Sequence, residues 1–146
     1  DKLDNGEIKP WSDFNSNEWL EQSIFSIKQD VKLLDLHILE KGALSMKAAL
    51  DKNNVKPEEI TYFLPHVSSY YFVDKLAKAL AERGVGIPME KWFLNLKDVG
   101  NVGSASIYLM VEEIMNSGKL KKGDKLLLSV PESGRFSYAY AYLTVY

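Results

Sequence analysis

Hydrophobic positions along the chain alternate between short continuous runs and longer stretches with a helical period. The short runs are rich in aromatic, leucine and β-branched residues and are bounded by turn residues, which is typical of buried strands. They cover 23–27, 60–64, 92–96 and 125–130. The longer stretches repeat apolar residues every three or four positions, which predicts helices. They cover 29–50, about 68–83 and 104–117, with Ser68, Ser69 and Ser104 placed to cap the last two.

The last hydrophobic stretch, 136–146, has a period of two rather than a continuous apolar character. Tyr138, Tyr140 and Tyr142 fall on one face of the predicted strand, and alanine and leucine fall on the other. A tyrosine stripe of this kind more often packs against a neighbouring layer than lines a substrate site. We therefore expect the three tyrosines to be packing residues.

The predicted order of elements is strand, helix, strand, helix, strand, helix, strand, strand. This alternation indicates an α/β fold with a mixed, mainly parallel sheet, helices on both faces and an antiparallel strand pair at the end. Residues 1–22 carry scattered aromatics among polar residues and have no clear period. We expect an irregular N-terminal segment at 1–22, with aromatics that pack on another surface, and one domain at 23–146.

Composition narrows the possible functions. The 146 residues include no cysteine, so a disulfide framework and a thiolate metal site are excluded, and so is a cysteine nucleophile within this chain. The two histidines, His37 and His66, lie far apart, so we expect no histidine-rich metal site and a structural role for His37. The net charge of −2 argues against nucleic-acid binding. Since no apolar stretch approaches the roughly 20 residues of a membrane span and no signal peptide is visible, we expect a cytoplasmic protein.

Two polar side chains follow predicted strands at the points where helices begin. His66 comes after the run 60–64, and Asn101 comes after the run 92–96. In open α/β sheets, ligands bind beyond the carboxyl ends of the strands, so the two side chains can converge if these strands are neighbours. An imidazole N–H and an amide N–H at one spot can stabilise an oxyanion or an enolate, but they supply no nucleophile.

Simpler interpretations of both residues stay open on the pattern alone. A histidine that follows Pro65 can bond a nearby backbone group and be structural. Asn101 stands between Gly100 and Val102, where asparagine is common because it tolerates left-handed turns. A third interpretation is a phosphate cradle at 100–104, although the spacing matches neither of the common glycine-rich phosphate motifs.

Two sequence elements together resemble a known family. Pro65-His66-Val67-Ser68-Ser69 is similar to a Pro-His-Gln-Ala-Asn element, and 100–106 is similar to a Gly-Asn-Thr-Ser-Ala-Ala-Ser element. Both belong, in this order, to the C-terminal half of the β-ketoacyl-acyl-carrier-protein synthase III family, whose fold is the thiolase fold. The likeness runs from about residue 23 to the end of the chain, so it implies a thiolase-like half-domain.

The resemblance implies roles for three residues. His66 and Asn101 match the family histidine and asparagine that bind the thioester carbonyl of a malonyl group and stabilise the enolate formed on decarboxylation. Gly134 matches the glycine whose backbone N–H contributes to the oxyanion hole. The third catalytic residue of the family, a cysteine, lies in its N-terminal half, so the resemblance implies that this chain is inactive alone.

The same resemblance implies substrates and partners. We expect acyl-CoA or acyl-carrier-protein thioesters as substrates, in fatty-acid or related secondary lipid biosynthesis, with no cofactor. The expected partners are the acyl carrier protein and the N-terminal half that carries the cysteine, and the complete enzyme is expected to be a homodimer. A non-catalytic scaffold or partner subunit of a condensing enzyme is the alternative.

Some positions depart from the family pattern. Val67 and Ser69 replace the glutamine and asparagine of the histidine element, and Tyr71 stands where many members carry an arginine near the carrier arm. Four basic residues nearby can form a patch for the acidic carrier protein, and a solvated helix face explains them equally well. They are Lys75, Lys78, Arg83 and Lys91.

Overall fold

The computed structural model of the protein describes residues 3, 5–26 and 29–146. The chain forms two units, Asp1–Asp30 and Val31–Tyr146. The first unit is built from polar turns, a 3₁₀ helix η1 (Trp11–Asp13) and a short helix α1 (Ser16–Glu21). The second unit contains the sheet and the longer helices. The boundary between the units therefore follows residue 30, whereas the sequence pattern places it after residue 22.

A capping box starts α1. The Asn15 side chain accepts hydrogen bonds from the backbone N–H groups of Asn17 and Glu18, and the Glu18 carboxylate accepts one from the Asn15 N–H. Three aromatic residues of this unit pack on one another, with ring centroids 5.5–6.1 Å apart. They are Trp11, Trp19 and Phe25.

The strand predicted at 23–27 is absent from the described residues. Residues 23–26 form turns and a bend, and Ile27 lies outside the described residues. Ser23 has a φ of 50°, a left-handed conformation that interrupts an extended chain. A short run of strand-forming residues becomes a strand only where a partner edge accepts its hydrogen bonds.

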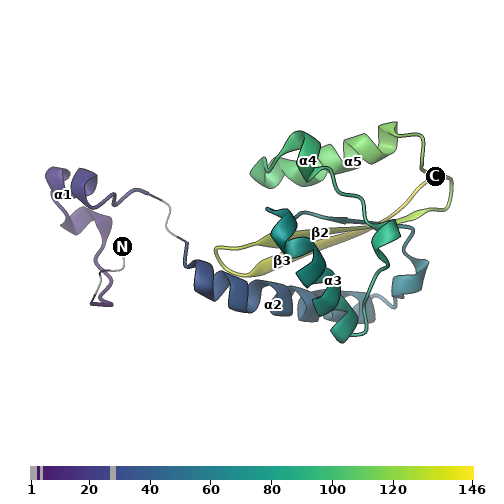
Figure 1. Ribbon diagram of the computed structural model, residues 1–146, viewed down its shortest axis with the longest axis horizontal. Helices are drawn as coiled ribbons and strands as arrows, with labels where there is room; N and C mark the ends of the chain where they lie inside the picture. Colours follow the sequence, from purple (N-terminus) through teal and green to yellow (C-terminus); the bar gives the residue numbers. More distant parts are fainter. Residues whose placement is uncertain (1–2, 4, 27–28) are drawn as a thin grey trace. The chain divides into compact units, whose positions relative to one another are not determined.

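The second unit is organised around a three-stranded mixed sheet. Strands β1 (Tyr62–Pro65), β2 (Lys125–Glu132) and β3 (Ser137–Thr144) lie in the order β1-β2-β3. The pair β1-β2 is parallel and the pair β2-β3 is antiparallel (Figure 1). The predicted α/β class and the antiparallel pair at the end of the chain are therefore confirmed.

The run 92–96, predicted as a strand, makes one parallel bridge with β1, between Trp92 and Phe63. The Phe93 N–H donates to the Phe63 carbonyl at 2.8 Å, and the chain then turns into the four-residue helix α4 (Leu96–Val99). The prediction of a full strand was wrong because this run includes Asn95, whose carbonyl accepts the N–H of Val99 at 3.0 Å. That hydrogen bond begins a helical turn.

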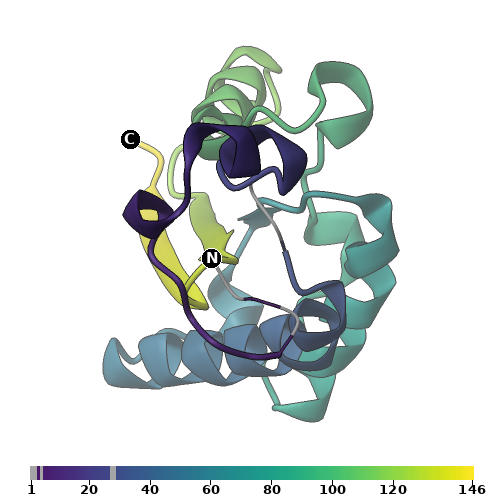
Figure 2. The same cartoon turned by 90° about the vertical axis from the view of Figure 1, so that its left-hand side faces the viewer.

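Helices cover both faces of the sheet, as predicted. Helices α2 (Val31–Lys52) and α3 (Val73–Glu82) lie on one face, and α5 (Ser106–Asn116) lies on the other (Figure 1). Figure 2 shows the same layers from the side, with α5 and α2 on opposite sides of the strands. Short 3₁₀ turns complete the unit. They are η2 (Pro57–Glu59), η3 (Tyr70–Phe72), η4 (Met89–Lys91) and η5 (Gly103–Ala105).

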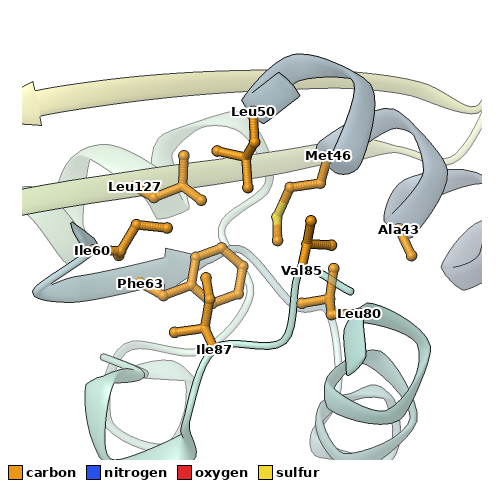
Figure 3. Packing of buried hydrophobic residues seen from close by; sticks show 9 residues of the cluster. All are labelled: Ala43, Met46, Leu50, Ile60, Phe63, Leu80, Val85, Ile87 and Leu127. Atoms are coloured by element: carbon orange, nitrogen blue, oxygen red, sulfur yellow. The ribbon is translucent and has the colours of Figure 1, made fainter. Parts of the chain in front are cut away.

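Strands β1 and β2 have buried side chains on both faces of the sheet, so a separate hydrophobic cluster lies on each face. Phe63 and Leu127 point toward α2 and α3, where they pack with Met46 and Leu80 (Figure 3). On the opposite face a second cluster packs against α5. It comprises Leu64, Ile107, Met110, Ile114 and Leu126. Burial on both faces explains why these strands have continuous apolar runs instead of alternation.

The tyrosine stripe of β3 packs on α2. The Tyr138 hydroxyl donates to the carbonyl of Ile38 at 2.6 Å, and the Tyr140 hydroxyl donates to that of Gly42 at 3.0 Å. A Cβ atom at Gly42 would lie 2.9 Å from the Tyr138 ring, so this close approach of helix and strand requires glycine. The interpretation of the stripe as packing is confirmed for these two tyrosines.

Candidate functional site

His66 lies directly beyond the last residue of β1. Its backbone N–H donates to the carbonyl of Ser129 in β2 at 2.8 Å, which extends the parallel ladder by one bond. The side chain is half-buried, and this burial lowers the pKa of His66 below its ordinary value of 6.5. This shift favours the uncharged imidazole at pH 7, in which one ring nitrogen carries an N–H that can donate.

A small pocket opens beside His66, at the carboxyl end of β1. Its polar lining comes from His66, Asn95 and Ser106, together with the backbone of Gly100. The rest of the lining is apolar and includes Val67, which is buried. Its empty volume of about 220 Å³ includes open solvent and lies below the range of about 300–1,000 Å³ usual for ligand sites, so the pocket can take only a small group of a larger ligand.

Asn101 lies in the loop that follows α4 and is not among the residues that line the pocket. The preceding residue, Gly100, lines the pocket and has a φ of 73°, which favours glycine. The Asn101 side chain is exposed, and its amide oxygen accepts the N–H of Gly103 at 3.0 Å. This bond leaves the amide nitrogen as the end of the side chain that can donate to a ligand.

The phosphate-cradle interpretation of 100–104 gains no support from the loop. A cradle uses backbone N–H groups that point at the anion, whereas the N–H of Gly103 is bonded to Asn101 within the loop. The N–H of Val102 donates to Ser106 Oγ at 3.2 Å. The predicted cap by Ser104 is absent, because η5 (Gly103–Ala105) precedes the helix and the N-cap of α5 is Ala105, which makes no side-chain cap bond.

Gly134 lies in the hairpin that joins β2 and β3. Its N–H donates to Glu132 Oε1 at 2.6 Å, and the neighbouring Arg135 N–H donates to Glu132 Oε2 at 3.0 Å. Gly134 follows the carboxyl end of β2, and β1 ends at the same side of the sheet. Gly134 is separate from the residues that line the His66 pocket.

Two polar residues that line the pocket were not singled out by the sequence patterns. Asn95 and Ser106 are the buried polar residues among those described, each 6% exposed. The Asn95 amide nitrogen donates to Glu113 Oε2 on α5 at 2.8 Å. The available sequence signal was an asparagine inside an otherwise apolar run, since a buried polar group requires a hydrogen-bond partner.

The basic residues considered for a carrier-protein patch have partners within the chain. Exposed ion pairs of this kind connect neighbouring helices or successive turns, and they contribute little to stability individually. The partners are Asp35 for Lys75 (3.0 Å), Glu82 for Lys78 (3.8 Å), Glu40 for Arg83 (2.8 Å) and the carbonyls of Glu58 and Ile60 for Lys91. These contacts favour the interpretation as a structural, solvated face.

Tyr71 belongs to the same surface network. Its hydroxyl donates to Asp35 Oδ1 at 3.2 Å, and it also bonds Lys75. The hydrogen bond with Tyr71, and then the one with Asp35, raises the pKa of Lys75. The hydrogen bond from Lys75 contributes most to lowering the pKa of Asp35. Tyr71 therefore ties α3 to α2.

Two further findings concern metals and membranes. Within residues 3, 5–26 and 29–146, no three histidine, aspartate or glutamate side chains gather in a way that could hold a metal ion. In the same residues, no helix has both the length and the apolar character needed to cross a bilayer.

The fold and the two sequence elements define a class. Residues 50–142 match the family described as 3-oxoacyl-[acyl-carrier-protein (ACP)] synthase III C terminal. The second unit shares its fold with thiolase-like synthases, including one from Xanthomonas oryzae with a TM-score of 0.71 at 23% identity, over 80% of this chain and 33% of that one. The chain belongs to the 3-oxoacyl-[acyl-carrier-protein] synthase III family, of which it contains the C-terminal part.

Individual relatives agree with this assignment. The chain is 35% identical over 88 residues to β-ketoacyl-[acyl-carrier-protein] synthase III of Aquifex aeolicus, covering 60% of this chain and 27% of the relative. It is 38% identical over 84 residues to the Clostridium perfringens synthase, covering 58% and 24%. The structure of the Thermus thermophilus synthase aligns with a TM-score of 0.66 at 28% identity, covering 81% of this chain and 35% of that one. The matched part of the chain thus spans about a quarter of the length of its curated relatives.

Proposed function

We propose that this chain is the C-terminal part of a condensing enzyme that joins acyl thioesters by decarboxylating Claisen condensation. The observation that supports the proposal is the neutral imidazole of His66, which lines a pocket together with the loop that leads to Asn101. The matching sequence elements and the family membership support the same reaction class.

In the proposed reaction both side chains act as hydrogen-bond donors to one oxygen. A malonyl thioester binds with its thioester carbonyl toward His66 and Asn101. The bond to the carboxylate breaks, carbon dioxide leaves, and the electron pair forms an enolate whose negative oxygen the two donors stabilise. The enolate carbon then attacks an acyl group held on a cysteine, and the thiolate leaves. A neutral imidazole suits this role because it donates without protonating the enolate outright.

The nucleophile has to come from outside this chain, which has no cysteine. We place it in an N-terminal half of the enzyme, so the chain by itself does not complete a turnover. Acyl-CoA and acyl-carrier-protein thioesters are the proposed substrates, and no cofactor is needed for this chemistry. The complete enzyme is proposed to be a cytoplasmic homodimer that works with an acyl carrier protein.

Gly134 is the proposed backbone donor to the oxygen of the cysteine-bound acyl group. In the structure its N–H donates to Glu132. The proposal therefore requires the Glu132 side chain to move aside when the acyl group is bound.

The test is to replace each proposed donor in the complete synthase. His66→Ala and Asn101→Ala are each expected to lower the rate of malonyl-thioester decarboxylation by about 10²–10³-fold, the usual effect of removing one oxyanion donor. Acylation of the cysteine by acyl-CoA, followed by mass spectrometry, is expected to continue. His37→Ala is the matched control, because His37 lies within α2, outside the pocket lining.

Normal decarboxylation by the His66→Ala enzyme would end the proposal. A non-catalytic partner subunit would then be the better interpretation. In that case the His66 variants would leave the activity of the partner synthase unchanged in the complex.

A further inference from the structure

Asn95 is a buried polar residue with a charged partner. Its side chain is 6% exposed, and its amide nitrogen donates to Glu113 Oε2 at 2.8 Å. Hydrogen bonds to a charged group are among the stronger ones, and a buried amide that loses its partner is costly. The side chain of Asn95 is therefore held in one position by α5.

The same residue begins the segment that carries Asn101. The Asn95 carbonyl accepts the N–H groups of Asp98 and Val99, each at 3.0 Å, and so starts α4. This helix is only four residues long, and its C-cap, Gly100, comes directly before Asn101. A short, stiff element thus connects the buried amide to the proposed donor.

A second bond to α5 holds the other side of the loop. Ser106 Oγ accepts the N–H of Val102 at 3.2 Å, directly after Asn101. Ser106 and Glu113 are seven residues apart in α5, so they lie two turns apart on one face of the helix. Side chains of this helix face therefore make hydrogen bonds to the chain before Asn101, at Asn95, and after it, at Val102.

We propose that Glu113 is a positioning residue, which acts through Asn95 to fix the loop of Asn101 relative to His66. Asn95 lines the pocket together with His66, whereas Glu113 is an exposed residue of α5 that is not among the lining residues. Glu113 therefore has no contact with the reacting atoms and affects the reaction only through the placement of Asn101. This inference rests on the proposed function.

The experiment compares variants of Glu113 in the complete synthase. Glu113→Ala is expected to lower kcat for malonyl-thioester decarboxylation by about 10- to 100-fold with little change in KM, as is usual when a supporting residue is lost. Glu113→Gln is expected to recover most of the rate, because its amide oxygen can still accept the Asn95 hydrogen bond. Glu112→Ala, which removes the adjacent carboxylate of the same helix, is the control and is expected to behave as wild type.

A readout of position accompanies the kinetics. Hydrogen exchange of the segment 96–103 is expected to speed up in Glu113→Ala and to stay near wild type in Glu113→Gln and Glu112→Ala. If Glu113→Ala does not fold, Glu113→Asp provides the same test, because it keeps the charge but draws the carboxylate back by one methylene. An intermediate loss of kcat is then expected.

Two results would overturn the inference. One is a folded Glu113→Ala enzyme with the wild-type kcat, and the other is a Glu113→Gln enzyme that loses as much activity as Glu113→Ala. Both are distinguishable from failure of the proposed function, which His66→Ala and Asn101→Ala decide independently.

Discussion

His66 owes its proposed role to the position that the end of β1 gives it. The backbone bond to Ser129 fixes the residue against β2, while the side chain is free to line the pocket. Burial then lowers the pKa of His66. The end of β1 therefore fixes where His66 lies, and burial of the side chain disfavours its charged form.

A pH dependence of stability follows from this burial. The pKa of His66 is lower in the folded protein than in the unfolded chain, so the unfolded chain binds the proton more readily between the two values. The contribution of neutral His66 to stability is expected to be complete above about pH 6.5, near the pKa of the unfolded chain. It is expected to be lost as the pH falls through the lower pKa of the folded protein. Chemical unfolding at pH 7.5 and pH 5 measures it, with His66→Ala as the reference.

The expected result is a wild-type free energy of unfolding that falls more steeply toward pH 5 than that of His66→Ala. Equal slopes for the two proteins would show that the surroundings of His66 do not disfavour its charged form.

At the scale of the elements, the contact of α2 with β3 depends on Gly42. The Tyr138 ring occupies the space that a side chain at this position would need, and its hydroxyl is bonded to Ile38 of the same helix. The sheet can approach α2 closely because the helix has no Cβ atom there. The packing of the tyrosine stripe therefore depends on one glycine in a long helix.

Gly42→Ala measures this dependence. Overpacking costs about 1–3 kcal/mol, whereas alanine gains roughly 0.5–1 kcal/mol over glycine within a helix. We expect a net destabilisation of about 1–2 kcal/mol in chemical denaturation. In a Tyr138→Ala background the clash is removed, so the same substitution is expected to stabilise the protein. Destabilisation of equal size in both backgrounds would exclude the ring contact as the cause.

The elements also show what sequence patterns can and cannot provide. Strands β1 and β2 were predictable from their continuous apolar runs, and β3 was predictable from its alternation. The position of His66 at the end of β1 was predictable because the residue follows one of these runs. The bond between Asn95 and Glu113 was not, because it joins residues 18 positions apart and depends on the packing of α5. The run 92–96 has the composition of a strand, but the Asn95 carbonyl accepts the N–H groups of Asp98 and Val99, and these local bonds start a helix.

For the whole molecule, the main observation is that the curated relatives are much longer than the part that matches this chain. The matched part covers 27% and 24% of the two curated synthases. The proposed reaction requires a cysteine that this chain does not contain. Both observations are explained if the functional protein includes an N-terminal half that contributes the cysteine to the active site of His66 and Asn101.

The mass of the native polypeptide tests this explanation. An immunoblot of the source cells with an antibody against Val31–Tyr146 is expected to show a band at roughly twice 16.6 kDa. A single band at 16.6 kDa would contradict the prediction of one polypeptide. The nucleophile would then have to come from a separate chain, which co-purification could identify.

The packing of the three tryptophans gives each unit its own optical signal. Trp11 and Trp19 contact each other in the first unit, whereas Trp92 packs edge-on against Phe63 in the α/β core, with ring centroids 4.9 Å apart. Replacing the first two with phenylalanine leaves one indole, whose emission reports on the core alone. Fluorescence of this variant can therefore follow the melting of the second unit by itself within the whole chain.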